Sequence, residues 1–196
     1  MNSDELFEIG EKLYHDGSKV QEAIIAFKEL VNSFPKHANG WQYLSTMYYE
    51  NAEFDKWLNA IDTAILIEPN NIWFKEIRLT SLSLLAKFSY QKPNFFKDVT
   101  KEYYAITSFQ DEKEIQLELL KSIEELLELN RDNPKKVYDY NMKLGHLKRK
   151  LQRFEDAINH FSFALKNIPS SYPEQRKERT IRNIEKLILA TNSEEG

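Results

Sequence analysis

The feature that most constrains the fold is a pair of apolar stripes with helical spacing, joined by a short polar break. In residues 41–69, Trp41, Leu44 and Tyr48 recur at intervals of three and four residues, which places them on one face of a helix. A second stripe follows the break and ends near Pro69. Because neither stripe can bury itself alone, the pattern predicts a two-helix hairpin that stacks on others of its kind.

Two further stretches carry a related set of markers, although the turn of the first is one residue longer than that of the last. A small residue lies in the first helix, an alanine and an aromatic residue lie in the second, and a proline ends the unit. In the first stretch these are Gly10, Ala23, Phe27 and Pro35, and in the last they are Gly145, Ala157, Phe161 and Pro169. The stretches resemble tetratricopeptide (TPR) repeats, whose pattern is W-x2-L-G-x2-Y, then A-x3-F, then P.

The resemblance implies an all-α, right-handed superhelical array of TPR-type hairpins, with about ten helices in a single domain. We expect regular repeats at 3–35, 38–71 and 137–170, a degenerate repeat at 72–109, an extra helix at 111–130 and a C-terminal capping helix at 173–190. Ser3 is expected to cap the first helix, and residues 192–196 are expected to form a frayed tail.

Three positions depart from the family pattern. Trp57 and Ile61 stand where alanine and an aromatic residue are usual, and Lys148 stands where tyrosine is usual. We expect Trp57 to tilt its hairpin or to occupy a local gap, because that position is a close helix crossing.

Composition limits the class of protein. The chain has no cysteine, which excludes disulfides and thiolate metal sites and is typical of a reducing cytoplasm. The first residues have no apolar run typical of a secretory signal, and no segment approaches the length of a membrane span. The four histidines form no metal-binding motif, and there is no phosphate-binding loop. We therefore expect a cytoplasmic protein that is not an enzyme, with no metal and no cofactor.

The charge is unevenly distributed along the chain. Residues 131–186 hold 14 Lys/Arg and 7 Asp/Glu, although the whole chain has a net charge of −4. Seven of these bases form a candidate patch for nucleic acid or for an acidic protein: Lys148, Arg149, Lys150, Arg153, Arg176, Arg179 and Arg182. Pairing with the acidic helix 111–129 is an alternative, and nucleic-acid binding is disfavoured by the acidic isoelectric point.

In TPR arrays the first helices of successive repeats line a concave groove, and the resemblance assigns groove positions here. These positions mix aromatic, amide and charged groups, which suits an extended peptide or a partner helix. The expected groove residues are Phe7, Glu11, Tyr14, Gln42, Thr46, Tyr49, Met142, His146 and Arg149. The Lys/Asn/Arg clamp for a carboxylate tail is absent, since Phe7, Glu11 and Tyr43 occupy its positions.

These observations predict a protein–protein interaction module that binds a peptide or a partner surface. Two alternatives stay open: a dedicated chaperone or immunity-type inhibitor of one partner, and a nucleic-acid-associated helper that uses the basic third.

Overall fold

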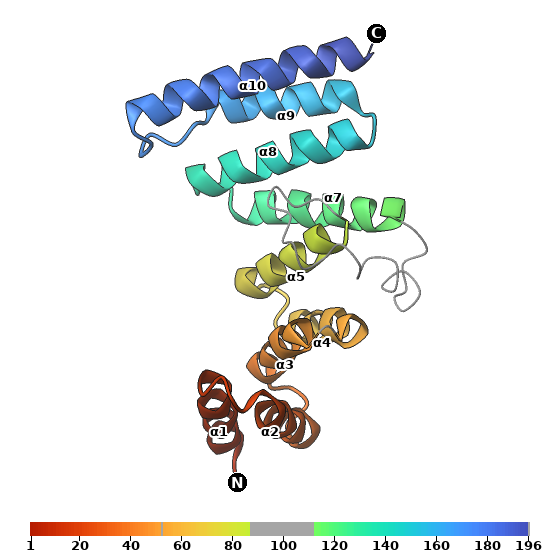
Figure 1. Cartoon of the computed structure of the whole chain (residues 1–196), viewed down its shortest axis with the longest axis vertical. Helices are drawn as coiled ribbons and strands as arrows, with labels where there is room; N and C mark the ends of the chain where they lie inside the picture. The colour runs from red at the N-terminus through yellow and green to blue at the C-terminus, as the bar shows by residue number, and fades with distance from the viewer. Residues whose placement is uncertain (52, 87–111, 196) are drawn as a thin grey trace. The chain divides into compact units, whose positions relative to one another are not determined.

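The structure is a computed structural model that describes residues 1–51, 53–86 and 112–195 (Figure 1). Within these ranges it consists of nine α-helices and has no strand, which confirms the expected all-α helical repeat fold. The second helix expected in the degenerate repeat, at 93–106, lies outside the described residues. In the described part of the chain, no helix is both long and apolar enough to cross a membrane.

The helices gather into two compact units, residues 1–112 and 113–196. In the first unit, α1 (Ser3–His15) packs on α2 (Val20–Ser33), and α3 (Ala38–Glu50) packs on α4 (Phe54–Ile67). Contacts between α2 and α3 join the two hairpins, and α5 (Ile72–Leu85) packs on α4. The regular repeats expected at 3–35 and 38–71 therefore correspond to these two hairpins.

The second unit contains α7 (Glu112–Leu129, from residue 113 on), α8 (Pro134–Lys150), α9 (Phe154–Lys166) and α10 (Glu174–Glu195). Figure 1 shows these four helices side by side in chain order. Helices α8 and α9 form a hairpin, and α10 covers α9. The apolar core of this unit contains Ala157 and Phe161 of α9 and Ile184 of α10. Helix α10, the expected capping helix, therefore buries an apolar face against α9.

A glycine packed against a phenylalanine ring sets the distance between the helices in two hairpins. A Cβ atom added to Gly10 would lie 2.7 Å from the ring of Phe27, and one added to Gly145 would lie 2.5 Å from the ring of Phe161. Both rings are fully buried. Each glycine is therefore required by the close approach of the second helix, not by an unusual backbone conformation.

The middle hairpin uses a different pair at the same repeat positions. Ser45 replaces the glycine and Ile61 replaces the phenylalanine, and both are fully buried. A larger residue on one helix thus accompanies a narrower one on the other. Among the described residues, none provides a hydrogen-bond partner for Ser45 Oγ.

Trp57 is accommodated inside its own hairpin. Its side chain is only 3% exposed, and its ring lies 4.7 Å from that of Tyr49. The unusual tryptophan therefore fills space between α3 and α4, so no gap is left at this crossing.

Three helix ends differ from the sequence-based expectation. Asn2, not Ser3, caps α1. The Asn2 side chain accepts a hydrogen bond from the backbone N–H of Glu5, and the Glu5 carboxylate accepts one from the backbone N–H of Asn2. Pro134 begins α8 instead of preceding it, because a helix needs no amide donor at that position. Helix α10 continues to Glu195 rather than ending near Ala190, since Thr191 is buried and Glu194 pairs with Arg149.

His146 packs within the second unit, with its ring 5.0 Å from that of Phe161 in an edge-on arrangement. Burial, aided by the nearby charge of Arg149, lowers the pKa of His146 to about 4. The histidine is thus held in its neutral form as part of the packing.

The first prediction concerns Gly145. Gly145→Ala should lower the free energy of unfolding by roughly 2 kcal/mol despite the better helix propensity of alanine, because the new methyl group meets the Phe161 ring. Phe161→Leu should cost less in the Gly145→Ala background than in the native one, with a coupling of about 1 kcal/mol. Urea denaturation of the double-mutant cycle measures this coupling, and strictly additive effects would contradict it.

The second prediction concerns Ser45. Ser45→Ala should raise the free energy of unfolding by about 1 kcal/mol, because it removes a buried hydroxyl that lacks a partner. Ser81→Ala is the matched control: Ser81 is equally buried, but its hydroxyl donates to the Ile77 carbonyl at 3.0 Å. Thermal and urea melts should show a gain for the first variant only. Equal effects of the two would rule out the unsatisfied hydroxyl as the cause.

The third prediction concerns pH. His146 takes up a proton near its ordinary pKa of 6.5 when the chain is unfolded, but only near pH 4 when it is folded. The free energy of unfolding should therefore be highest above pH 6.5 and fall by roughly 1–3 kcal/mol as the pH drops toward 4. His146→Gln should flatten this slope in urea titrations, whereas His15→Gln removes an exposed ring and serves as the control. An unchanged slope in His146→Gln would exclude this histidine as its source.

Candidate partner-binding site

The expected groove residues of the first hairpin meet a single ring of the second. The rings of Phe7 and Tyr14 both approach Tyr43 edge-on, each with its centroid 5.5 Å away. Tyr43 in turn stacks on buried Phe27, with centroids 4.9 Å apart and planes inclined by 11°. The result is an aromatic cluster between α1 and α3 in which Phe7, Tyr14 and Tyr43 remain half-exposed.

Two carboxylates border this cluster and accept hydrogen bonds from its tyrosine hydroxyls. Tyr43 Oη donates to Glu11 Oε1 at 2.6 Å, and Tyr14 Oη donates to Glu50 Oε1 at 3.2 Å. Burial together with the bond to Glu11 raises the pKa of Tyr43 to about 12. Burial and the charge of Glu50 also raise the pKa of Tyr14. The hydroxyls therefore stay protonated and hold both carboxylates beside the rings.

The three groove residues expected on α3 form a stripe next to this cluster. Gln42 Nε2 donates a hydrogen bond to Thr46 Oγ1 at 3.1 Å, and the ring of Tyr49 packs against that of Trp57. All three side chains are half-exposed. Burial and the charge of Glu50 raise the pKa of Tyr49. We call the combined surface the α1–α3 face, defined as Phe7, Glu11, Tyr14, Gln42, Tyr43, Thr46, Tyr49 and Glu50.

The corresponding residues of the last hairpin lie against the chain's own helices. Met142 packs on the core formed by α9 and α10, and His146 contacts Phe161. The guanidinium of Arg149 forms two hydrogen bonds with the Glu194 carboxylate of α10, with Nε 2.9 Å from Oε2. The structure therefore groups the nine expected residues into two sets, one in each unit.

The sequence-based list of groove residues does not contain Tyr43 and Glu50. Tyr43 appears there only as a position that lacks a clamp residue, and Glu50 is not singled out. The available signal was spacing: the two residues are seven apart, so they share one side of α3, next to the stripe of Gln42, Thr46 and Tyr49.

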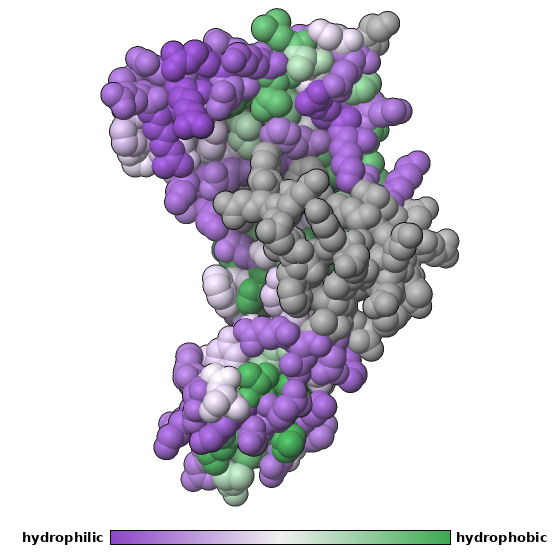
Figure 2. Space-filling view, in the orientation of Figure 1, coloured by the Kyte–Doolittle hydropathy of each residue, from purple (hydrophilic) through white to green (hydrophobic). Residues whose placement is uncertain are grey.

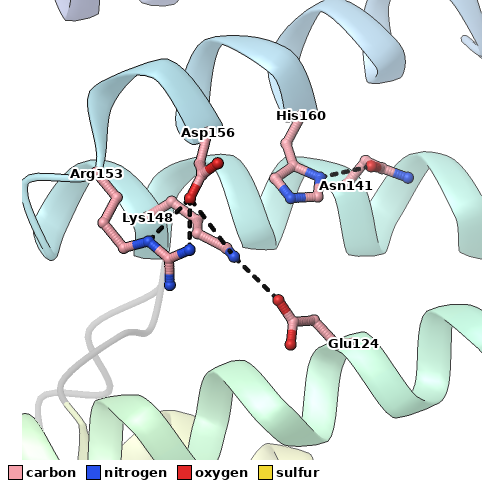
Figure 3. A network of polar contacts seen from close by, with 6 residues as sticks. All are labelled: Glu124, Asn141, Lys148, Arg153, Asp156 and His160. Atoms are coloured by element: carbon pink, nitrogen blue, oxygen red, sulfur yellow. Dashed lines mark hydrogen bonds and ion pairs between the residues drawn. The ribbon is translucent and has the colours of Figure 1, made fainter.

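Two bases of the basic third, Lys148 and Arg153, pair with the chain's own carboxylates (Figure 3). Lys148 is buried, and its Nζ lies 3.0 Å from Glu124 Oε1 on α7 and 3.9 Å from Asp156 Oδ2 on α9. Arg153 also binds Asp156, at 2.6 Å. Pairing of this region with the acidic helix, one of the sequence-based alternatives, is thus observed at Lys148.

A second polar pair lies beside this network. The amide oxygen of buried Asn141 is 2.9 Å from His160 Nδ1, and its amide nitrogen donates to the Val137 carbonyl at 2.8 Å. Burial, followed by the charge of Lys148, lowers the pKa of His160. Figure 3 shows both groups in the space between facing helices, where they tie α8 to α7 and α9.

A search of the described residues finds no group of three His, Asp or Glu side chains positioned to hold a metal ion.

Comparison with known proteins gives partial matches. No protein-family model matches the chain. The peroxisomal targeting signal receptor of Komagataella phaffii is 30% identical over 71 residues, which is 36% of this chain and 12% of the receptor. The receptor of the same name from Yarrowia lipolytica is 32% identical over 66 residues, which is 34% of this chain and 11% of the receptor. The chain thus corresponds to a small fraction of these relatives.

Solved structures match over nearly the whole chain. The crystal structure of MamA protein has a TM-score of 0.59 at 14% identity, covering 97% of this chain and 86% of that one. The MamA RS-1 ArsTM double mutant has a TM-score of 0.59 at 10% identity and covers 97% of both chains. At such identities the likeness concerns the fold alone. With the hairpin spacing and the small–aromatic crossings, these matches show that the chain has the tetratricopeptide-type helical repeat fold predicted from its sequence.

Proposed function

We propose that the chain is a non-enzymatic interaction module of the cytoplasm, and that the α1–α3 face is where it binds a peptide or a partner helix. The fold supports a role in protein–protein interaction. The observation that carries the choice of face is the half-exposed aromatic cluster of Phe7, Tyr14 and Tyr43, with carboxylates fixed beside it.

The chemistry of this face suits recognition of another protein. Rigid aromatic rings offer contact area at low entropic cost, and Gln42 and Thr46 offer groups that pair with a peptide backbone. Figure 2 shows hydrophobic residues as separate patches among hydrophilic ones on the visible side of the first unit. Such a mixed surface favours a reversible contact over a permanent hydrophobic one.

The last hairpin supports the proposal less strongly. Met142, His146 and Arg149 already contact α9 or α10, so a partner would have to compete with the chain's own helices there. Nucleic-acid binding is also less well supported than the charge alone indicates. Three bases of the candidate patch pair with carboxylates, and Arg176 lies 3.8 Å above the Tyr172 ring.

The comparisons add limited support. The curated relatives are named as receptors for a targeting signal, which is consistent with recognition of a protein segment. Because the chain spans only 12% of such a receptor, neither its cargo nor its compartment is transferred to this protein. A dedicated chaperone or inhibitor of one partner would use the same face and differ in having a single tight partner.

The fourth prediction tests the face. A photo-crosslinking amino acid placed at Gln42 or Thr46 should capture a partner in the source cell several-fold more efficiently than one placed at Gln21 or Asn59. The control positions are exposed on the second helices of the same hairpins, and Gln21 matches Gln42 in residue type. Immunoblotting and mass spectrometry of the crosslinked species measure the difference. Capture mainly from Gln21 and Asn59 would move the interaction to the other helices.

A further inference from the structure

The helices of the proposed binding face carry an uncompensated negative charge. Helices α1 and α3 together contain five carboxylates and one lysine, a net charge of −4. Their partners in the hairpins, α2 and α4, together have a net charge of −2. The charge imbalance of the two hairpins thus lies mainly on the side that bears the aromatic cluster.

The two carboxylates at the cluster are bound by tyrosine hydroxyls. In the part of the chain that the structure describes, Glu11 and Glu50 form no ion pair and accept bonds from tyrosine hydroxyls. Other carboxylates of this unit do have cations: Asp16 pairs with Lys19 at 2.8 Å, and Asp62 pairs with Arg78 at 2.6 Å.

The second unit contains a comparable contact in which a cation does pair with the glutamate. Tyr14 and Arg149 stand at the same repeat position, four residues after Gly10 and Gly145. Tyr14 of α1 binds Glu50 of α3, and Arg149 of α8 binds Glu194 of α10, so each contacts a glutamate two helices further along the chain. In the last hairpin a guanidinium therefore neutralises the glutamate. In the first hairpin a phenol holds the glutamate, and its charge remains.

Lysine and arginine side chains are the groups that this arrangement attracts. A carboxylate accepts several hydrogen bonds, so each of these keeps acceptor capacity beyond its tyrosine. The rings beside them are aromatic, and a cation gains further stabilisation over the face of such a ring. A partner's carboxylates would meet Glu11 and Glu50 and be repelled.

We propose that the partner of the α1–α3 face is a basic protein segment, whose lysine or arginine side chains bind Glu11 and Glu50 beside the rings of Phe7, Tyr14 and Tyr43. This inference rests on the proposed function, since it names the class of segment that the same face takes. It excludes acidic tails and C-terminal carboxylates as the main determinant of binding.

The test uses the full chain and three fluorescent peptides of equal length, in which leucine alternates with arginine, glutamine or glutamate. Anisotropy titrations should give the tightest binding for the arginine peptide, with an affinity that falls as salt is added. Glu11→Gln combined with Glu50→Gln should weaken this binding roughly tenfold and reduce its salt dependence. Glutamine keeps an acceptor for each tyrosine, and circular dichroism melts check that the fold is retained.

The matched control is Glu22→Gln combined with Glu29→Gln. This variant also removes two negative charges, but from the exposed side of α2. It should change the affinity less than about twofold, because exposed charges distant from the binding face are screened. Equal losses in the two double variants, equal affinity for the three peptides, or no binding of the arginine peptide would each overturn the proposal. If the arginine peptide fails while Gln42 and Thr46 still capture a partner, the face binds a segment of another charge and only this inference falls.

Discussion

The close crossing of two helices at a glycine is the interaction on which the hairpins depend. At Gly10 and Gly145 the absence of a side chain lets a phenylalanine ring lie directly on the helix backbone. The ring of Phe161 then becomes the core on which His146, Ile184 and the capping helix assemble. Because these contacts repeat along the chain, each hairpin offers the next one a surface of similar shape.

This dependence explains which features could be predicted from the sequence. Residues at the crossings are fixed by sterics, so Gly10, Ala23, Gly145 and Ala157 identified the hairpins and their ends. Ser45 and Ile61 stand at the corresponding positions of the middle hairpin, and the structure shows that both are fully buried there, so this crossing is filled by a different combination of residue sizes. Trp57 likewise gave a correct signal of departure, but its outcome depended on Tyr49, which lies on the facing helix.

The polar and aromatic contacts of individual positions, those of the candidate site included, were harder to predict, because they depend on partners that the repeat pattern does not fix. Tyr48 and Lys148 hold the same repeat position. The tyrosine ring lies within 6 Å of Lys28 and Lys56, whereas Lys148 lies between Glu124 and Asp156. An aromatic residue between cations has thus been exchanged for a cation between carboxylates. Sequence spacing located the position, but the identity of its neighbours required the fold.

The hairpins of the two units are built alike, and ion pairs between neighbouring helices occur in both, as Arg78 with Asp62 shows in the first unit. The difference lies in the carboxylates beside the aromatic cluster. In the second unit buried and half-buried bases find carboxylates on neighbouring helices, which fixes α7, α8, α9 and α10 to one another. In the first unit the partners of Glu11 and Glu50 among the described residues are tyrosine hydroxyls, which leave the negative charge of both carboxylates in place. A repeat fold permits this difference because the close crossings recur in each hairpin, whereas the residues around them vary. Tyr14 and Arg149 illustrate this variation, since they stand at the same repeat position and bind a glutamate with a phenol and with a guanidinium, respectively.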